Sequence, residues 1–189
     1  MIRVVGTLPP GPGIVVAIPH VSHLDGPLLA AYLPEPILWG VDPESMETQP
    51  WKAGLWLTCS LTGSEIVPLS SDKPFGMRAL AKRLRAGGKV GIFPEGGINR
   101  TKEPLLPLQQ GAERLAQLCQ VPIIPVRIVG MREWILSPAK AERKRWLPRV
   151  RVEVGSTFER TSHQDGLIWS PQRSVPSQTD SFLIKQEQR

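Results

Sequence analysis

The segment His20-Val21-Ser22-His23-Leu24-Asp25 combines imidazole and carboxylate groups over a very short stretch. One nitrogen of an imidazole can take a proton while the other donates to a carboxylate, which fixes the tautomer and stabilises the imidazolium. His20 and Asp25 fit these two roles and are the candidate catalytic residues. No G-x-S-x-G motif accompanies them, so the nucleophile would belong to the substrate. From the residues alone, a capping Asp beside a hydrogen-bonded histidine is an equal alternative.

A second candidate segment is Phe93-Pro94-Glu95-Gly96-Gly97-Ile98-Asn99-Arg100. Glycines let the backbone approach a ligand, Glu95 can accept hydrogen bonds, and Arg100 can hold an anion. Glu95, Gly96, Gly97 and Arg100 are therefore the candidate substrate-binding residues. The phosphate-loop pattern G-x-x-x-x-G-K-[ST] is absent, and an ordinary turn with a surface charge pair would look the same.

A metal site is disfavoured by the supply of ligands. His20, His23 and Asp25 are close in sequence, but the one further histidine is His163, and H-E-x-x-H does not occur. Cys59 and Cys119 each lie in an apolar stretch, which is typical of buried, reduced thiols. We expect no metal.

A third feature is a run of basic residues around Trp146, namely Lys140, Arg143, Lys144, Arg145, Arg149 and Arg151. Basic side chains near tryptophan suit an anionic membrane surface, where each charge contributes about 1 kcal/mol. RNA could be bound by the same chemistry, although no recognition motif supports it, and a solvated basic loop remains an alternative.

The composition of the chain indicates the kind of protein in which these segments lie. The chain has 189 residues, 41% hydrophobic and 21% charged, which predicts one soluble globular domain with a single core. The formal net charge of +6 suggests an anionic partner without choosing among nucleic acid, lipid headgroups and phosphorylated cofactors. Neither a secretory signal nor a membrane-spanning stretch is visible, so we expect a cytoplasmic protein.

Short β-branched runs alternate with helical patterns along the chain. Strands are expected at 14–18, 65–69, 89–93, 121–129 and 150–154, and helices at 24–33, 51–61, 72–86 and 108–119, with Ser22 as cap of the first helix. The alternation predicts an α/β fold, a mostly parallel sheet flanked by helices, whose ligands bind beyond the carboxyl ends of strands. Both candidate segments follow such ends. We assign 1–158 to this single domain and 159–189 to a polar, mobile tail.

Taken together, the two segments resemble the H-x4-D and F-P-E-G blocks of the glycerophospholipid acyltransferase superfamily, which includes the lysophosphatidic acid acyltransferases. Ile66-Val67-Pro68-Leu69 and Val121-Pro122-Ile123-Ile124-Pro125-Val126 resemble its second and fourth blocks. The closest resemblance is to the acyltransferase half of the bifunctional 2-acylglycerophosphoethanolamine acyltransferase/acyl-ACP synthetases. It extends from about Arg3 to Gly130 and implies a glycerol-3-phosphate acyltransferase-like fold.

The resemblance implies transfer of an acyl group from acyl-CoA or acyl carrier protein to a hydroxyl of a lysophospholipid, of the 1-acylglycerol-3-phosphate or lysophosphatidylethanolamine type. His20 would deprotonate the hydroxyl, Asp25 would hold the imidazole, and Glu95 and Gly96 would belong to the acceptor site. No cofactor beyond the thioester co-substrate and no nucleic acid are implied. We expect a protein peripheral to the inner face of the membrane. A catalytically weak module that binds lipid or anionic surfaces and retains the fold is the alternative.

The chain departs from the family pattern at two positions. Leu69 stands where many members have an arginine, and Gly97-Ile98 replaces the Thr-Arg of F-P-E-G-T-R. Guanidinium groups hold phosphate through paired hydrogen bonds, so their loss weakens recognition of a dianionic headgroup. Arg100 and Arg127 remain as candidates. We expect the preference for lysophosphatidic acid over lysophosphatidylethanolamine to be small or reversed.

Overall fold

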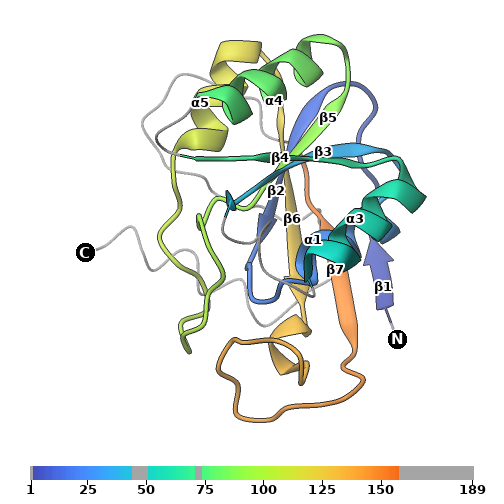
Figure 1. The fold of residues 1–189 in the computed structure, drawn as a ribbon, viewed down its shortest axis with the longest axis vertical. Helices are drawn as coiled ribbons and strands as arrows, with labels where there is room; N and C mark the ends of the chain where they lie inside the picture. The colour runs from blue at the N-terminus through green and yellow to red at the C-terminus, as the bar shows by residue number, and fades with distance from the viewer. Residues whose placement is uncertain (1, 44–50, 71–73, 158–189) are drawn as a thin grey trace.

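A seven-stranded sheet forms the centre of the molecule, in the order β1-β7-β6-β2-β5-β3-β4 (Figure 1). The computed structural model describes residues 2–43, 51–70 and 74–157, so the tail expected at 159–189 lies outside the described residues. The strands are β1 Ile2–Val5, β2 Gly13–Ile18, β3 Ile37–Val41, β4 Glu65–Pro68, β5 Lys89–Ile92, β6 Ile123–Val129 and β7 Val150–Val154. Each neighbouring pair is parallel except β6 and β7, which are antiparallel. The predicted single α/β domain is confirmed.

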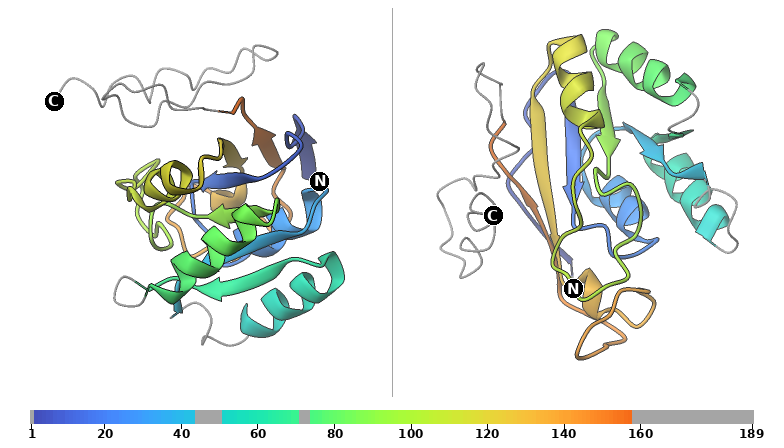
Figure 2. Two further views of the ribbon diagram at one scale, coloured as in Figure 1. Left: turned by 90° about the horizontal axis from the view of Figure 1, so that it is seen from above. Right: turned by 90° about the vertical axis from the view of Figure 1, so that its left-hand side faces the viewer.

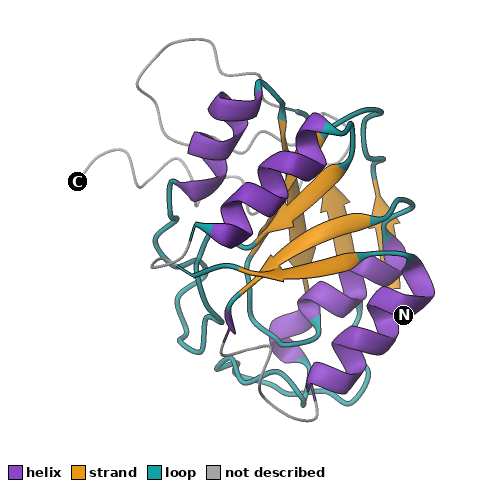
Figure 3. Ribbon diagram, turned by 45° about the horizontal axis from the view of Figure 1, so that its top comes forward, coloured by secondary structure: helices purple, strands orange, loops and turns teal. Residues whose placement is uncertain are grey.

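The helices cover both faces of this sheet (Figure 3). They are α1 Asp25–Tyr32, α3 Trp51–Thr62, α4 Phe75–Arg85 and α5 Gly111–Cys119, with a short 3-10 helix, η1, at Met131–Glu133. Every residue of β2 is buried, as expected for a central parallel strand. Side chains alternate along it: Val15 and Ala17 join a core cluster with α1, while Ile14 and Val16 join another with α4 and α5. The strand that leads to His20 is thus fixed from both sides.

Two strands were not predicted. β1 is short and pairs with β7, while β3 lies in an apolar run without alternation, which periodicity alone does not identify as a strand. The helix expected from Leu108 begins only at Gly111, because the backbone N–H of Gln109 donates to the carbonyl of Pro94 (2.7 Å). This hydrogen bond joins the residues before α5 to the loop that follows β5 (Figure 2).

The expected cap of the first helix is wrong. Leu24 is the N-cap residue of α1, and no side chain caps the helix. The Ser22 hydroxyl instead accepts the N–H of Leu24 (3.2 Å), inside the turn that precedes the helix. Cys59 and Cys119 are both free thiols, Cys59 buried and Cys119 partly so.

Candidate active site

The two candidate segments meet at the carboxyl ends of adjacent strands. β2 pairs with β5 in parallel, so the turn after Ile18 lies beside the loop after Ile92. The backbone N–H of His20 donates to Oε1 of Glu95 (2.6 Å), across 75 positions of sequence. The N–H of Asn99 donates to the carbonyl of His20 (2.7 Å). The structure thus brings both segments together as the parallel topology predicts.

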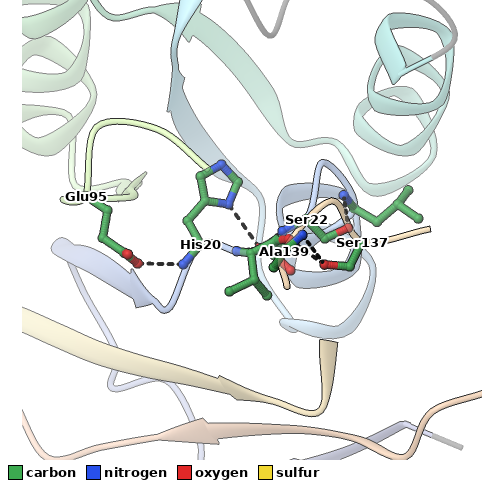
Figure 4. A network of polar contacts seen from close by, with 8 residues as sticks. His20, Ser22, Glu95, Ser137 and Ala139 are labelled. Atoms are coloured by element: carbon green, nitrogen blue, oxygen red, sulfur yellow. Dashed lines mark hydrogen bonds and ion pairs between the residues drawn. The ribbon is translucent and has the colours of Figure 1, made fainter. Parts of the chain in front are cut away.

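His20 and Asp25 form the expected contact. The Nδ1 atom of His20 lies 3.0 Å from Oδ2 of Asp25, and the backbone N–H groups of Val21 and Ser22 donate to the same oxygen (2.7 and 2.9 Å). Asp25 is fully buried, and its Oδ1 atom has no partner in the part of the chain that the structure describes. The His20 side chain is 15% exposed, and its other ring nitrogen points away from the carboxylate (Figure 4). A ring nitrogen without a bond to the carboxylate is chemically able to accept a proton.

A row of aromatic rings orients the imidazole from its other side. The ring of His20 stacks on Phe93, with centroids 4.1 Å apart, and Phe93 stacks on Trp39 at 5.7 Å. Trp39 is buried and lies over Gly91 of β5, where any Cβ atom would collide with its ring. Stacking and the bond to Asp25 together leave the imidazole little rotational freedom.

Glu95 is a buried carboxylate held by backbone groups. It accepts the N–H of His20 on one oxygen and that of Leu106 on the other (3.0 Å). Burial raises the pKa of Glu95, and the two backbone hydrogen bonds oppose that rise. Its main contribution in this geometry is to fix the backbone of the His20 turn.

The two glycines after Glu95 differ. Gly96 has a positive φ of 72°, and a Cβ there would collide with the Gln109 side chain, so glycine is required by the turn itself. A Cβ at Gly97 would meet no atom within 4 Å. Gly97 therefore leaves an open approach to the backbone, consistent with its candidate role in substrate binding.

Arg100 lies close to the histidines. Burial lowers the pKa of His23, and the positive charges of His20 and Arg100 lower it further, while Asp25 opposes them. The Arg100 side chain is exposed and forms no hydrogen bond or ion pair within the described residues. Its loop is shaped by buried Asn99, whose Oδ1 accepts the N–H and hydroxyl of Thr101 (3.0 and 2.8 Å). Arg100 is thus an exposed cation whose charge acts on His23.

Two further positions of the family pattern, Leu69 and Arg127, contact other parts of the protein. Leu69 packs over Gly40 and Gly76 in the apolar cluster with α4 and α5. Arg127 lies 4.0 Å from Glu153 of β7. Of the two arginines expected to remain for phosphate recognition, Arg127 is engaged by this carboxylate.

Several side chains of the predicted basic patch have partners within the protein. Nζ of Lys144 donates to four backbone carbonyls, Arg145 pairs with Glu133 (3.0 Å) and Arg151 with Glu153 (2.7 Å). The sequence could not distinguish these hydrogen-bonded or paired charges from unpaired ones. Of the six residues of this basic run, Lys140, Arg143 and Arg149 have no side-chain partner in the part of the chain that the structure describes. The exposed side chains of Trp146 and Leu147 lie among them in sequence.

Two side chains that support the site, Ser137 and Arg132, were not predicted from the sequence. Ser137 bonds to the carbonyl of Val21, 116 positions away, and Arg132 bonds to the loop after Arg100. Neither belongs to a motif, and no spacing rule links them to the segments they touch.

The structure thus places a histidine, held by a buried aspartate, at the end of a central parallel strand and beside a Glu-Gly turn. Residues 1–129 match the family model described as Acyltransferase, and the chain belongs to this family. Among described residues, no group of three or more His, Cys, Asp or Glu could hold a metal ion, and no described helix could span a membrane.

Two relatives illustrate the likeness. The 1-acyl-sn-glycerol-3-phosphate acyltransferase of Bacillus subtilis (strain 168) is 29% identical over 126 residues, 65% of this chain and 59% of the relative. The crystal structure of the 1-acyl-sn-glycerophosphate (LPA) acyltransferase PlsC from Thermotoga maritima matches 87% of this chain and 64% of that one, with a TM-score of 0.60 and 20% identity. The chain spans less than two thirds of either protein, and the structural match shows a shared fold.

Proposed function

We propose that this protein transfers an acyl group from an acyl thioester to a hydroxyl of a lysophospholipid. The observation that carries the proposal is the His20–Asp25 pair, 3.0 Å apart, with one imidazole nitrogen directed away from the carboxylate. Membership of the Acyltransferase family and the likeness to the Bacillus subtilis enzyme support it.

In the proposed reaction, His20 removes the proton of the acceptor hydroxyl as its oxygen attacks the thioester carbonyl. The tetrahedral intermediate then expels the thiolate, which takes the proton from the imidazolium, leaving an ester and a free thiol. Asp25 keeps the imidazole oriented and stabilises its charged form. General base catalysis of this kind contributes about 10²–10⁴-fold to the rate. The acceptor is the nucleophile, so no acyl-enzyme and no cofactor are needed.

The acceptor phosphate would lie near Arg100 and His23, with Gly97 open to it. One available guanidinium suits a phosphodiester better than a phosphate monoester with nearly two charges. We therefore expect kcat/KM for lysophosphatidic acid to exceed that for lysophosphatidylethanolamine only slightly, or to be the lower of the two. Measuring both acceptors in the same detergent and salt tests this, and a hundredfold preference for lysophosphatidic acid would contradict it.

Access to a lipid acceptor would come from peripheral binding to an anionic membrane, which we place at the inner face of the cytoplasmic membrane. Lys140, Arg143 and Arg149 supply unpaired cations, and Trp146 and Leu147 supply exposed apolar groups beside them. This combination favours a surface with anionic headgroups and an apolar interior.

The decisive experiment incubates purified protein with a panel of lysophospholipids and either acyl-CoA or acyl carrier protein as donor. We expect thiol release that depends on the acceptor and a matching amount of diacyl product. A protein that binds anionic vesicles but consumes no thioester with any acceptor would instead be the non-catalytic lipid-binding module.

A further inference from the structure

Residues 131–149, between β6 and β7, lie next to the loops that hold the candidate site; we call them the brace (Figure 1). The hydroxyl of Ser137, which is buried, donates to the carbonyl of Val21 (2.6 Å). The N–H of the same Val21 donates to Oδ2 of Asp25 (2.7 Å). Ser137 therefore bonds to a residue that also fixes the carboxylate of the catalytic pair (Figure 4).

The brace also bonds to the loop that contains Arg100. The guanidinium of Arg132 donates to the carbonyls of Thr101 and Glu103, the latter at 2.7 Å. The N–H of Lys140 donates more weakly to the carbonyl of Arg100 (3.4 Å). Arg100 thus lies in a loop whose backbone is bonded to the brace at three carbonyls, although its own side chain stays exposed.

Lys144 joins the two contact points. Its Nζ donates to the carbonyls of Arg132 (3.1 Å), Trp134 (3.3 Å), Ser137 (2.8 Å) and Ala139 (2.7 Å). An ammonium has only three protons, so they are shared among these acceptors. Both Arg132 and Ser137 are among the residues whose backbone it gathers, so their side chains are presented at a fixed separation.

We propose that the brace positions the catalytic turn and the acceptor loop relative to each other, with Ser137 acting on the His20–Asp25 pair, Arg132 acting on the Arg100 loop, and Lys144 coupling the two. None of these three residues needs to touch the substrate, so they are positioning residues. The proposal rests on the proposed function, because the roles of His20 and Arg100 are taken from it.

The two contacts predict opposite kinetic signatures. Ser137→Ala should lower kcat with little change in acceptor KM, whereas Arg132→Met should raise acceptor KM with little change in kcat. Displacements of about 1 Å can cost up to about 10²-fold, so we expect about tenfold for each single change. Lys144→Met should show both effects, and Ser137→Thr, which keeps the hydroxyl, should restore kcat.

Glu142→Gln is the matched control, because Glu142 is an exposed residue of the same segment without a hydrogen bond or ion pair to the described residues. It should leave both kinetic constants unchanged. Urea denaturation of every variant separates positioning from lost stability. The proposal would be overturned if kcat fell equally in Ser137→Ala and Arg132→Met and the fall matched the loss of folded protein. It would also be overturned if both variants had wild-type kinetics.

A second readout needs no turnover. In nuclear magnetic resonance spectra, the imidazole resonances of His20, assigned with His20→Ala, should shift in Ser137→Ala and stay unchanged in Arg132→Met. If the wild-type protein consumes no thioester, the proposed function fails, yet this comparison of spectra still decides the brace. Unchanged His20 resonances in Ser137→Ala would refute it.

Discussion

β5 carries a buried charge near each of its ends, and the two are treated differently. At the amino end, Nζ of Lys89, which is 2% exposed, donates to the carbonyl of Gly11 and to Oε2 of Glu35, both at 2.7 Å. Just beyond the carboxyl end, Glu95 is 7% exposed and is held only by backbone N–H groups. Within the described residues no Lys, Arg or His side chain forms an ion pair with it.

The contrast indicates that the amino end of β5 contributes to stability, whereas the carboxyl end belongs to the candidate site. The buried ammonium of Lys89 is compensated by an opposite charge and a carbonyl. The carboxyl end instead holds Glu95 with a raised pKa and Asp25 with one oxygen lacking any partner in the described structure. Incompletely satisfied groups of this kind are concentrated where a protein performs its reaction.

The largest effect is expected for His20→Ala, a change at the carboxyl end of the sheet. Loss of the general base should reduce kcat by about 10²–10⁴-fold. The unfolding free energy should change by less than about 2 kcal/mol, because Asp25 keeps its two backbone donors. His23→Ala is the comparison and should lose far less activity. Undiminished thiol release in His20→Ala would remove His20 from the mechanism.

The second effect concerns the unpaired charges at the surface. Replacing Lys140, Arg143 and Arg149 together with glutamine should weaken binding to anionic vesicles by about 10²-fold, at about 1 kcal/mol for each charge. Binding should also fall as salt is added. The pair Arg145→Gln and Arg151→Gln should matter less, because both arginines are already paired with glutamates. Vesicle sedimentation measures this, and equal binding of the wild type to neutral and anionic vesicles would contradict it.

The third prediction tests the amino end of β5. Lys89→Met should lower the unfolding free energy by about 1–3 kcal/mol, because the half-exposed Glu35 can regain water. Glu35→Gln should cost more, since it leaves the buried ammonium without its counter-charge. Urea denaturation compares the two. A fall in kcat for Lys89→Met at unchanged stability would show that the two ends of β5 are not independent.

The smallest effect is a pH dependence of stability at Glu95. Its pKa is higher in the folded than in the unfolded chain, so its stabilising contribution is present below the ordinary value and is lost as pH rises through the folded one. The unfolding free energy of the wild type should therefore decline over this range relative to Glu95→Gln. Denaturation curves at a series of pH values measure the difference, and parallel profiles would contradict the assignment.

The parallel sheet and the meeting of the two segments were predictable because they follow from local patterns and a general rule of topology. β-branched runs mark strands such as β2, and residues after neighbouring parallel strands share one edge. The contact between Ser137 and Val21 was not predictable, since 116 positions separate them and a serine in a loop has no preferred partner. The bonds of Lys144 were not predictable for a related reason: a basic side chain near tryptophan has the same sequence pattern whether or not it donates to four carbonyls of its own loop.

Gly91 shows how far the demands of the site extend into the scaffold. A side chain there would displace the ring of Trp39, which stacks on Phe93, which stacks on His20. Gly91 offers no functional group and lies inside β5, yet it has almost no mutational tolerance if the base is to keep its orientation. Among variants selected only for being folded and abundant, substitutions at Gly91 should be accepted by the fold more often than by the reaction. The orientation of the candidate base therefore constrains Gly91, a position without any reactive side chain.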